Sequence, residues 1–148
     1  MKKYFILFSI LLMTSLFSQI KEDLIMAIYP GCEHTKKDKD AALSCFSKKF
    51  GEHLKNIVDY KYNYSEKKDN NEYIDVTAKI NLVITGKGNL KVTSVDSPDD
   101  SFNKVVEQSI ILIDKYLEQA NKKIQPAINP EGKTLSLRLS LPITKSYN

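Results

Sequence analysis

The stretch that most constrains the fold runs from Ile74 to Ile84, where apolar and polar residues alternate. The apolar members are Ile74, Val76, Ala78, Ile80, Leu82 and Ile84. A period of two places these side chains on one face of a β-strand and the polar residues on the other. Only Val83 departs from the pattern. We therefore expect a strand with one face on a core and the other in water.

Two further strands are expected around this one. Residues 86–89, Gly-Lys-Gly-Asn, indicate a hairpin, because glycine and asparagine tolerate positive φ. A weaker second strand follows and carries its apolar side chains at Leu90, Val92 and Val95. The last strand, residues 134–143, alternates leucines and Ile143 with polar residues. Pro142 cannot donate a ladder hydrogen bond, so this strand should lie at a sheet edge.

Two helices are predicted from apolar stripes with helical spacing. Residues 102–120 form one continuous stripe, which Asp99, Asp100 or Ser101 could cap at its N-terminus. A second stripe predicts an N-terminal helix near residues 40–58, capped by Asp40.

These elements define an α+β fold of two layers. A hairpin makes the second strand antiparallel to the first, and helix 102–120 then returns the chain before the third strand. The third strand can therefore pair antiparallel with the first, which gives the sheet order second, first, third. Helix 102–120 should cover the apolar face of this three-stranded antiparallel sheet.

The alternating residues Tyr60, Tyr62 and Tyr64 leave two interpretations open. They form either a short strand with an exposed aromatic strip or an extended linker whose tyrosines cover one sheet edge. We expect the linker, followed by a polar loop over residues 65–72.

The N-terminus predicts export. Lys2 and Lys3 precede an almost unbroken apolar run from Tyr4 to Phe17, which is typical of a signal peptide spanning residues 1–18. An uncleaved signal anchor is the alternative. We expect a helical, disulfide-containing segment at 19–59 and an α+β domain at 60–148.

Two cysteines in an exported chain favour a disulfide between Cys32 and Cys45. Closing a loop of that size stabilises the fold by roughly 3 kcal/mol in the chain-entropy model. The alternative is a zinc site that also uses His34 and His53, although their spacing matches no common zinc pattern.

Composition argues against several functions. The acids are scattered and Gly86-Lys87-Gly88 lies in a hairpin rather than before a helix, so we expect neither an enzyme nor a cofactor. The net charge is only +4, and Arg138 is the single arginine, so a nucleic-acid partner is not expected. No small-molecule substrate is indicated.

Two segments of the chain between about residues 60 and 144 carry a resemblance to a known family: Gln125-Pro126-Ala127 through Gly132-Lys133, and Leu139-Ser140-Leu141-Pro142-Ile143. This region resembles the C-terminal domain of the TonB family, envelope proteins that transmit force to outer-membrane transporters. Upstream of it, Tyr29-Pro30-Gly31-Cys32-Glu33 with Cys45-Phe46 resembles the segment that precedes this domain in one TonB-like subgroup. The chain differs from the family in having Ile124 where an aromatic residue usually precedes the loop proline. It also lacks the family's proline-rich spacer, so we expect binding rather than full energy transduction.

The resemblance implies a periplasmic module that pairs a peptide of an outer-membrane TonB-dependent transporter with its edge strand. We predict that the peptide-binding residues are Ser136, Leu137, Arg138, Leu139 and Ser140, with Arg138 as the polar selector. The alternative is a structural or assembly component of the envelope that forms a homodimer through the same edge.

Overall fold

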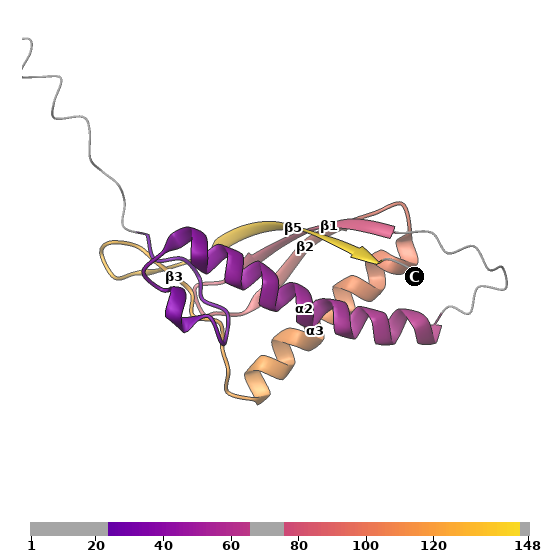
Figure 1. Ribbon diagram of the computed structural model, residues 1–148, viewed down its shortest axis with the longest axis horizontal. Coiled ribbons are helices and arrows are strands. Elements are labelled where there is room, and N and C mark those ends of the chain that lie inside the picture. The colour runs from indigo at the N-terminus through magenta and orange to yellow at the C-terminus, as the bar shows by residue number, and fades with distance from the viewer. Residues whose placement is uncertain (1–23, 66–75, 146–148) are drawn as a thin grey trace, which may run out of the picture.

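The computed structural model describes residues 24–65 and 76–145 (Figure 1). Its elements in chain order are η1 (Glu33–Thr35), α2 (Lys39–Ser65), β1 (Val76–Ile84), β2 (Leu90–Asp96), α3 (Asp100–Gln119), β3 (Ala127–Ile128), β4 (Thr134–Leu135) and β5 (Leu137–Lys145). The predicted signal peptide, most of the predicted loop at 65–72 and the first two residues of the predicted central strand lie outside the described residues.

The main sheet confirms the predicted α+β fold, because its three antiparallel strands lie in the order β2-β1-β5. The alternating pattern of β1 explains its central position. Ala78, Ile80, Leu82 and Ile84 are at most 1% exposed, whereas the intervening residues are partly or fully exposed. One face of β1 is therefore core and the other faces solvent.

A β-bulge at Thr93 explains the irregular pattern of β2. Asn81 of β1 pairs with Ser94, and Leu82 then pairs with Val92, so Thr93 is the extra residue. The Thr93 hydroxyl donates a hydrogen bond to the Asn81 carbonyl, with 2.9 Å between the oxygens. Because the bulge shifts the pleat by one residue, Val92 and Val95 both face the core although they lie three positions apart.

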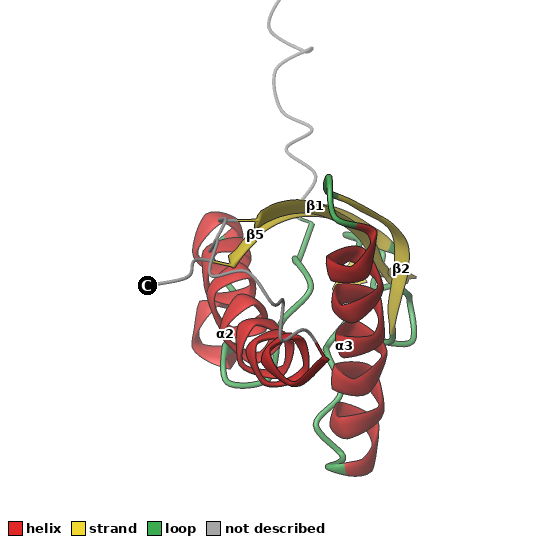
Figure 2. Ribbon diagram, turned by 90° about the vertical axis from the view of Figure 1, so that its right-hand side faces the viewer, coloured by secondary structure: helices red, strands yellow, loops and turns green. Residues whose placement is uncertain are grey.

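Both long helices pack under the apolar face of the sheet. The sheet arches over them, with α2 on the side of β5 and α3 on the side of β2 (Figure 2). The side chain of Asp99, one of the three predicted caps, accepts hydrogen bonds from the amides of Ser101 and Phe102 and caps α3. The predicted cover of the sheet is thus present, and α2 adds a second helix to the same layer.

The capping prediction for α2 is wrong. The side chain of Asp38 accepts hydrogen bonds from the amides of Asp40 and Ala41, both 3.0 Å long. Asp38 precedes the first helical residue, so it has the N-cap geometry, and Asp40 lies inside the first turn.

The interpretation of Tyr60, Tyr62 and Tyr64 as a strand or an extended linker is also wrong, because α2 continues through all three to Ser65. Between Gly51 and Ser65 the sequence contains no glycine or proline, the two residues that most disfavour a helix. The residue boundary expected at 59/60 therefore falls inside a continuous helix. Tyr60 is 73% exposed on its surface.

A second small sheet joins the N-terminal segment to the rest of the fold. The backbone of Ile25 exchanges two 2.9 Å hydrogen bonds with Ile128, and that of Ile28 does the same with Gln125. β3 in turn pairs with β4. Buried side chains of residues 26–29, α2, α3 and the main sheet form one hydrophobic core.

Candidate functional site

The predicted peptide-binding residues lie on or beside β5, which is an edge strand. β5 pairs with β1 over nine positions, from Ile84–Leu137 to Val76–Lys145. Among the described residues, no other strand pairs with β5. We call the side of β5 that faces away from β1 the outer edge.

The hairpin determines which backbone groups of β5 point to the outer edge. The amide of Thr85 donates to the carbonyl of Asn89, so Thr85 and alternate β1 residues such as Val83 direct their backbone groups toward β2. The intervening residues Ile84 and Leu82 therefore point toward β5. Their partners are Leu137 and Leu139, which are engaged with β1.

By the same alternation, the residues whose backbone groups point outward are Arg138, Ser140, Pro142 and Thr144. Pro142 fits this assignment, because a residue without an amide N–H leaves the ladder to β1 intact only at an outward position. Arg138 and Ser140 each offer one N–H donor and one carbonyl acceptor. Of the four predicted contact residues that lie within β5, these two present strand-pairing groups at the outer edge.

The side chains of the predicted residues divide between the two faces of the sheet. Arg138 and Ser140 are exposed on the polar face, while Leu137 and Leu139 are half-buried against the core. Ser136 is exposed between β4 and β5.

Arg138 has an uncharged cross-strand partner. Its neighbour across β1 is Val83, and the β2 residue that pairs with Val83 on its other side is Lys91. Among the described residues, no carboxylate forms an ion pair with Arg138. Lys133 and Glu131 form an ion pair of 3.2 Å with each other, in the loop before β4.

At the opposite edge of the sheet, which β2 forms, the first backbone amide already has a hydrogen-bond partner. Asp114 of α3 accepts a 2.8 Å hydrogen bond from the Leu90 amide and a 3.4 Å bond from the side-chain amide of Asn89. The bulge at Thr93 adds a second obstacle to strand pairing, because it bends β2 and leaves its ladder irregular. The outer edge of β5 is therefore the more regular of the two.

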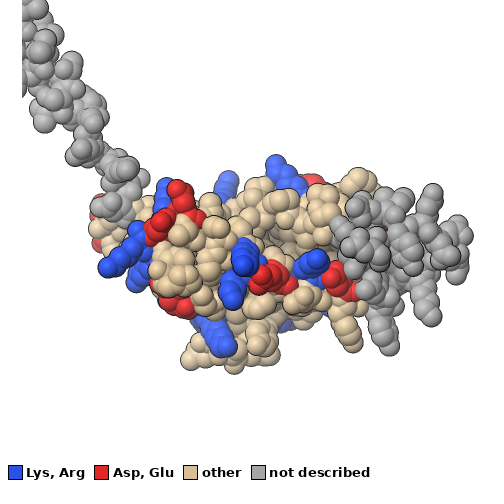
Figure 3. Space-filling model, viewed as in Figure 1, with Lys and Arg blue, Asp and Glu red and all other residues tan. Residues whose placement is uncertain are grey.

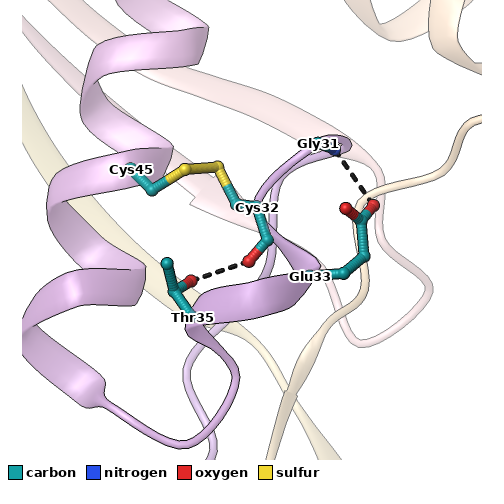
Figure 4. The surroundings of a disulfide bond; sticks show 5 residues. All are labelled: Gly31, Cys32, Glu33, Thr35 and Cys45. Atoms are coloured by element: carbon teal, nitrogen blue, oxygen red, sulfur yellow. Dashed lines mark hydrogen bonds between the residues drawn. A yellow bond between two sulfur atoms is a disulfide. The ribbon is translucent and has the colours of Figure 1, made fainter.

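The predicted disulfide between Cys32 and Cys45 is confirmed, with 5.9 Å between the Cα atoms (Figure 4). It joins α2 to the segment after the Tyr29–Gly31 turn, in which Gly31 has a φ of +88°. The Thr35 hydroxyl donates to the Cys32 carbonyl at 2.7 Å, and Glu33 accepts a bond from the Gly31 amide at 3.0 Å.

The zinc alternative is wrong, because the disulfide leaves neither cysteine with a thiolate to offer a metal. Within the part of the chain that the structure describes, no group of three or more histidine, cysteine, aspartate or glutamate side chains could hold a metal ion.

His53 instead contacts Tyr29, an interaction that sequence reasoning missed. The Tyr29 hydroxyl and His53 Nδ1 lie 2.9 Å apart, although the two residues are 24 positions apart in the chain. The Tyr29 ring is fully buried and packs edge-on against Phe46, with 5.3 Å between centroids. Burial raises the pKa of Tyr29, and the nearby Tyr116 raises it further. No sequence motif links these residues.

Positively and negatively charged residues are interspersed on one face of the molecule. On the face shown in Figure 3, Lys and Arg side chains alternate with Asp and Glu side chains.

No helix in residues 24–65 or 76–145 combines the length and the apolar character that a membrane crossing requires.

Comparison of the chain with protein-family models, with curated proteins and with solved structures finds no match.

Proposed function

We propose that this chain is an exported, non-enzymatic binding module that captures an extended peptide along the outer edge of β5. One observation carries the proposal. The backbone groups of Arg138 and Ser140 point away from β1, whereas the other edge of the sheet begins with the Leu90 amide bonded to Asp114. Addition of a strand to an exposed edge is a common mode of peptide recognition.

Main-chain pairing would supply affinity, and side chains at the edge would supply selectivity. Each backbone hydrogen bond contributes about 0.5–1.5 kcal/mol net. Arg138 is exposed and has Val83 as its cross-strand neighbour, so its guanidinium is available to a carboxylate on the added strand. The resemblance to the TonB C-terminal domain makes the N-terminal segment of an outer-membrane transporter the peptide that we propose.

Fluorescence anisotropy with labelled peptides from the N-terminal segments of outer-membrane transporters tests this function. Ser140→Pro removes one outward amide but leaves the residues that hydrogen-bond to β1 unchanged, so we expect it to weaken binding at least roughly two- to tenfold. Arg138→Glu should weaken binding of acidic peptides. Lys79→Glu reverses a charge on the same sheet face, but on the central strand, and should leave affinity unchanged.

Two results would contradict the proposal. The first is equal affinity of the unaltered chain and Ser140→Pro for these peptides, when circular dichroism shows that both proteins are folded. The second is a stable dimer in sedimentation velocity that Ser140→Pro dissociates, because a second copy would then occupy the edge. Mass spectrometry of the protein isolated from its cells would test export by identifying the mature N-terminal residue.

A further inference from the structure

We infer that Pro142 fixes the length and register of the strand that β5 accepts, and that this strand alternates apolar and polar residues. The inference rests on the proposed function and specifies the chemistry of its peptide.

The first step concerns the backbone groups along the outer edge. Arg138 and Ser140 each present a donor and an acceptor, whereas Pro142 presents only its carbonyl. An antiparallel strand would therefore form complete two-bond pairs at residues 138 and 140 and a single bond at 142. The carbonyl of the added strand opposite Pro142 would find no donor, so regular pairing ends there. A peptide of about five residues fills the edge from Arg138 to Pro142.

The second step concerns the core face of β5. Leu137, Leu139, Leu141 and Ile143 point toward the core but are only half-buried, whereas their partners on β1 are at most 1% exposed. β1 has a strand on each side, and β5 has a strand on one side only. Inward side chains of an added strand would lie beside these residues, above the layer that contains α2 (Figure 2). Apolar residues at alternate peptide positions would complete their burial.

The third step concerns the opposite face. Arg138 and Ser140 are exposed on the polar side of the sheet, where Asn81 donates to Ser94 at 2.9 Å. The outward side chains of an added strand would lie beside this polar surface and in contact with water. The peptide that matches both faces therefore has apolar residues at every second position and polar residues between them.

The test uses three labelled synthetic peptides with charged ends for solubility. A five-residue and a nine-residue peptide alternate threonine and valine. The third has the composition of the nine-residue peptide, but its valines are consecutive. We expect the alternating nine-residue peptide to bind at least roughly threefold more tightly than its isomer, because only the alternating order presents valines on one face.

Pro142→Ala restores the missing donor without altering the residues that hydrogen-bond to β1. We expect it to tighten binding of both peptides roughly two- to tenfold, the equivalent of one backbone hydrogen bond. The nine-residue peptide should gain more than the five-residue peptide, because its pairing can then continue to Thr144. Pro130→Ala is the matched control, because Pro130 is exposed in the loop before β4. It should alter neither affinity.

The outcomes separate this inference from the proposed function. If the alternating peptide binds and Ser140→Pro weakens its binding, but Pro142→Ala has no effect or the isomer binds equally well, the inference is wrong and the proposed function stands. If neither these peptides nor the transporter segments bind, both are wrong.

Discussion

Gly88 offers the sharpest test of how the hairpin is joined to the core. It has a φ of +82°, and a Cβ atom added there would lie 2.1 Å from the backbone carbonyl oxygen of Ile124. Ile124 is 1% exposed, so its backbone has little room to move. Gly88→Ala therefore combines a left-handed conformation with a steric clash.

The magnitude follows from these two contributions. Alanine in the left-handed region costs about 1–2 kcal/mol, and displacing well-packed neighbours costs about 1–3 kcal/mol. We therefore expect Gly88→Ala to lower the free energy of unfolding by about 2–5 kcal/mol. Gly132 has a φ of +79° and no heavy atom within 4 Å of an added Cβ, so Gly132→Ala should cost only about 1–2 kcal/mol.

Urea denaturation of the two variants isolates the contact with Ile124, because both share the conformational cost. Gly51→Ala provides a control of opposite sign. Gly51 lies within α2 with no heavy atom near its added Cβ, so alanine should stabilise the fold by about 0.5–1 kcal/mol. Equal destabilisation by Gly88→Ala and Gly132→Ala would refute the reasoning about close packing of the hairpin.

Three further predictions concern the core and its attachments. Burial raises the pKa of Tyr29, so the folded protein keeps a proton that the unfolded chain loses above the ordinary tyrosine value of 10.0. The free energy of unfolding, measured by urea denaturation at each pH, should therefore fall between pH 9 and pH 11, and it should fall less in Tyr29→Phe. An equal fall with pH in the two proteins would contradict this. Replacing both Cys32 and Cys45 with alanine should cost about 3 kcal/mol, measured against the oxidised protein, and a loss below about 1 kcal/mol would count against the loop-closure argument. Asp114→Ala should lower the free energy of unfolding by about 1.5–3 kcal/mol and expose the Leu90 amide to hydrogen exchange. Unchanged protection of that amide would contradict the hydrogen bond between Asp114 and Leu90.

Most of the main sheet could be predicted because its signals are local. The alternation through Ile84 assigns β1 a core face, and the glycines that follow it require a turn. The hairpin and the returning helix then restrict the strand order, and Pro142 places β5 at an edge. The expectation of export, together with the presence of two cysteines, was sufficient to predict the disulfide.

The features that the sequence did not predict depend on distant or competing contacts. The pairing of Ile25 with Ile128 joins segments about a hundred residues apart and involves too few residues to leave a periodic pattern. The tyrosines near Tyr60 alternate over only five positions, and the helix that already buries Leu54 and Val58 continues through them. The bulge at Thr93 is decided by register with β1.

The candidate site was only partly predictable for a similar reason. The sequence predicts that residues 136–140 belong to an edge strand, and residues 137–140 do lie in β5, but it does not show which of them turn their backbone groups outward. That distinction follows from the Thr85–Asn89 hydrogen bond, which sets the phase of the whole ladder. The closure of the opposite edge by Asp114 also required the packing of α3 against the hairpin.

Hydrogen exchange along β5, followed residue by residue by NMR, measures the state of this edge directly. The amides of Leu137, Leu139 and Leu141 should be protected by their bonds to β1, while those of Arg138 and Ser140 should exchange rapidly with water. Protection of Arg138 and Ser140 equal to that of the leucines would contradict the account, because it would mean that this edge is already occupied or that the ladder has the opposite phase.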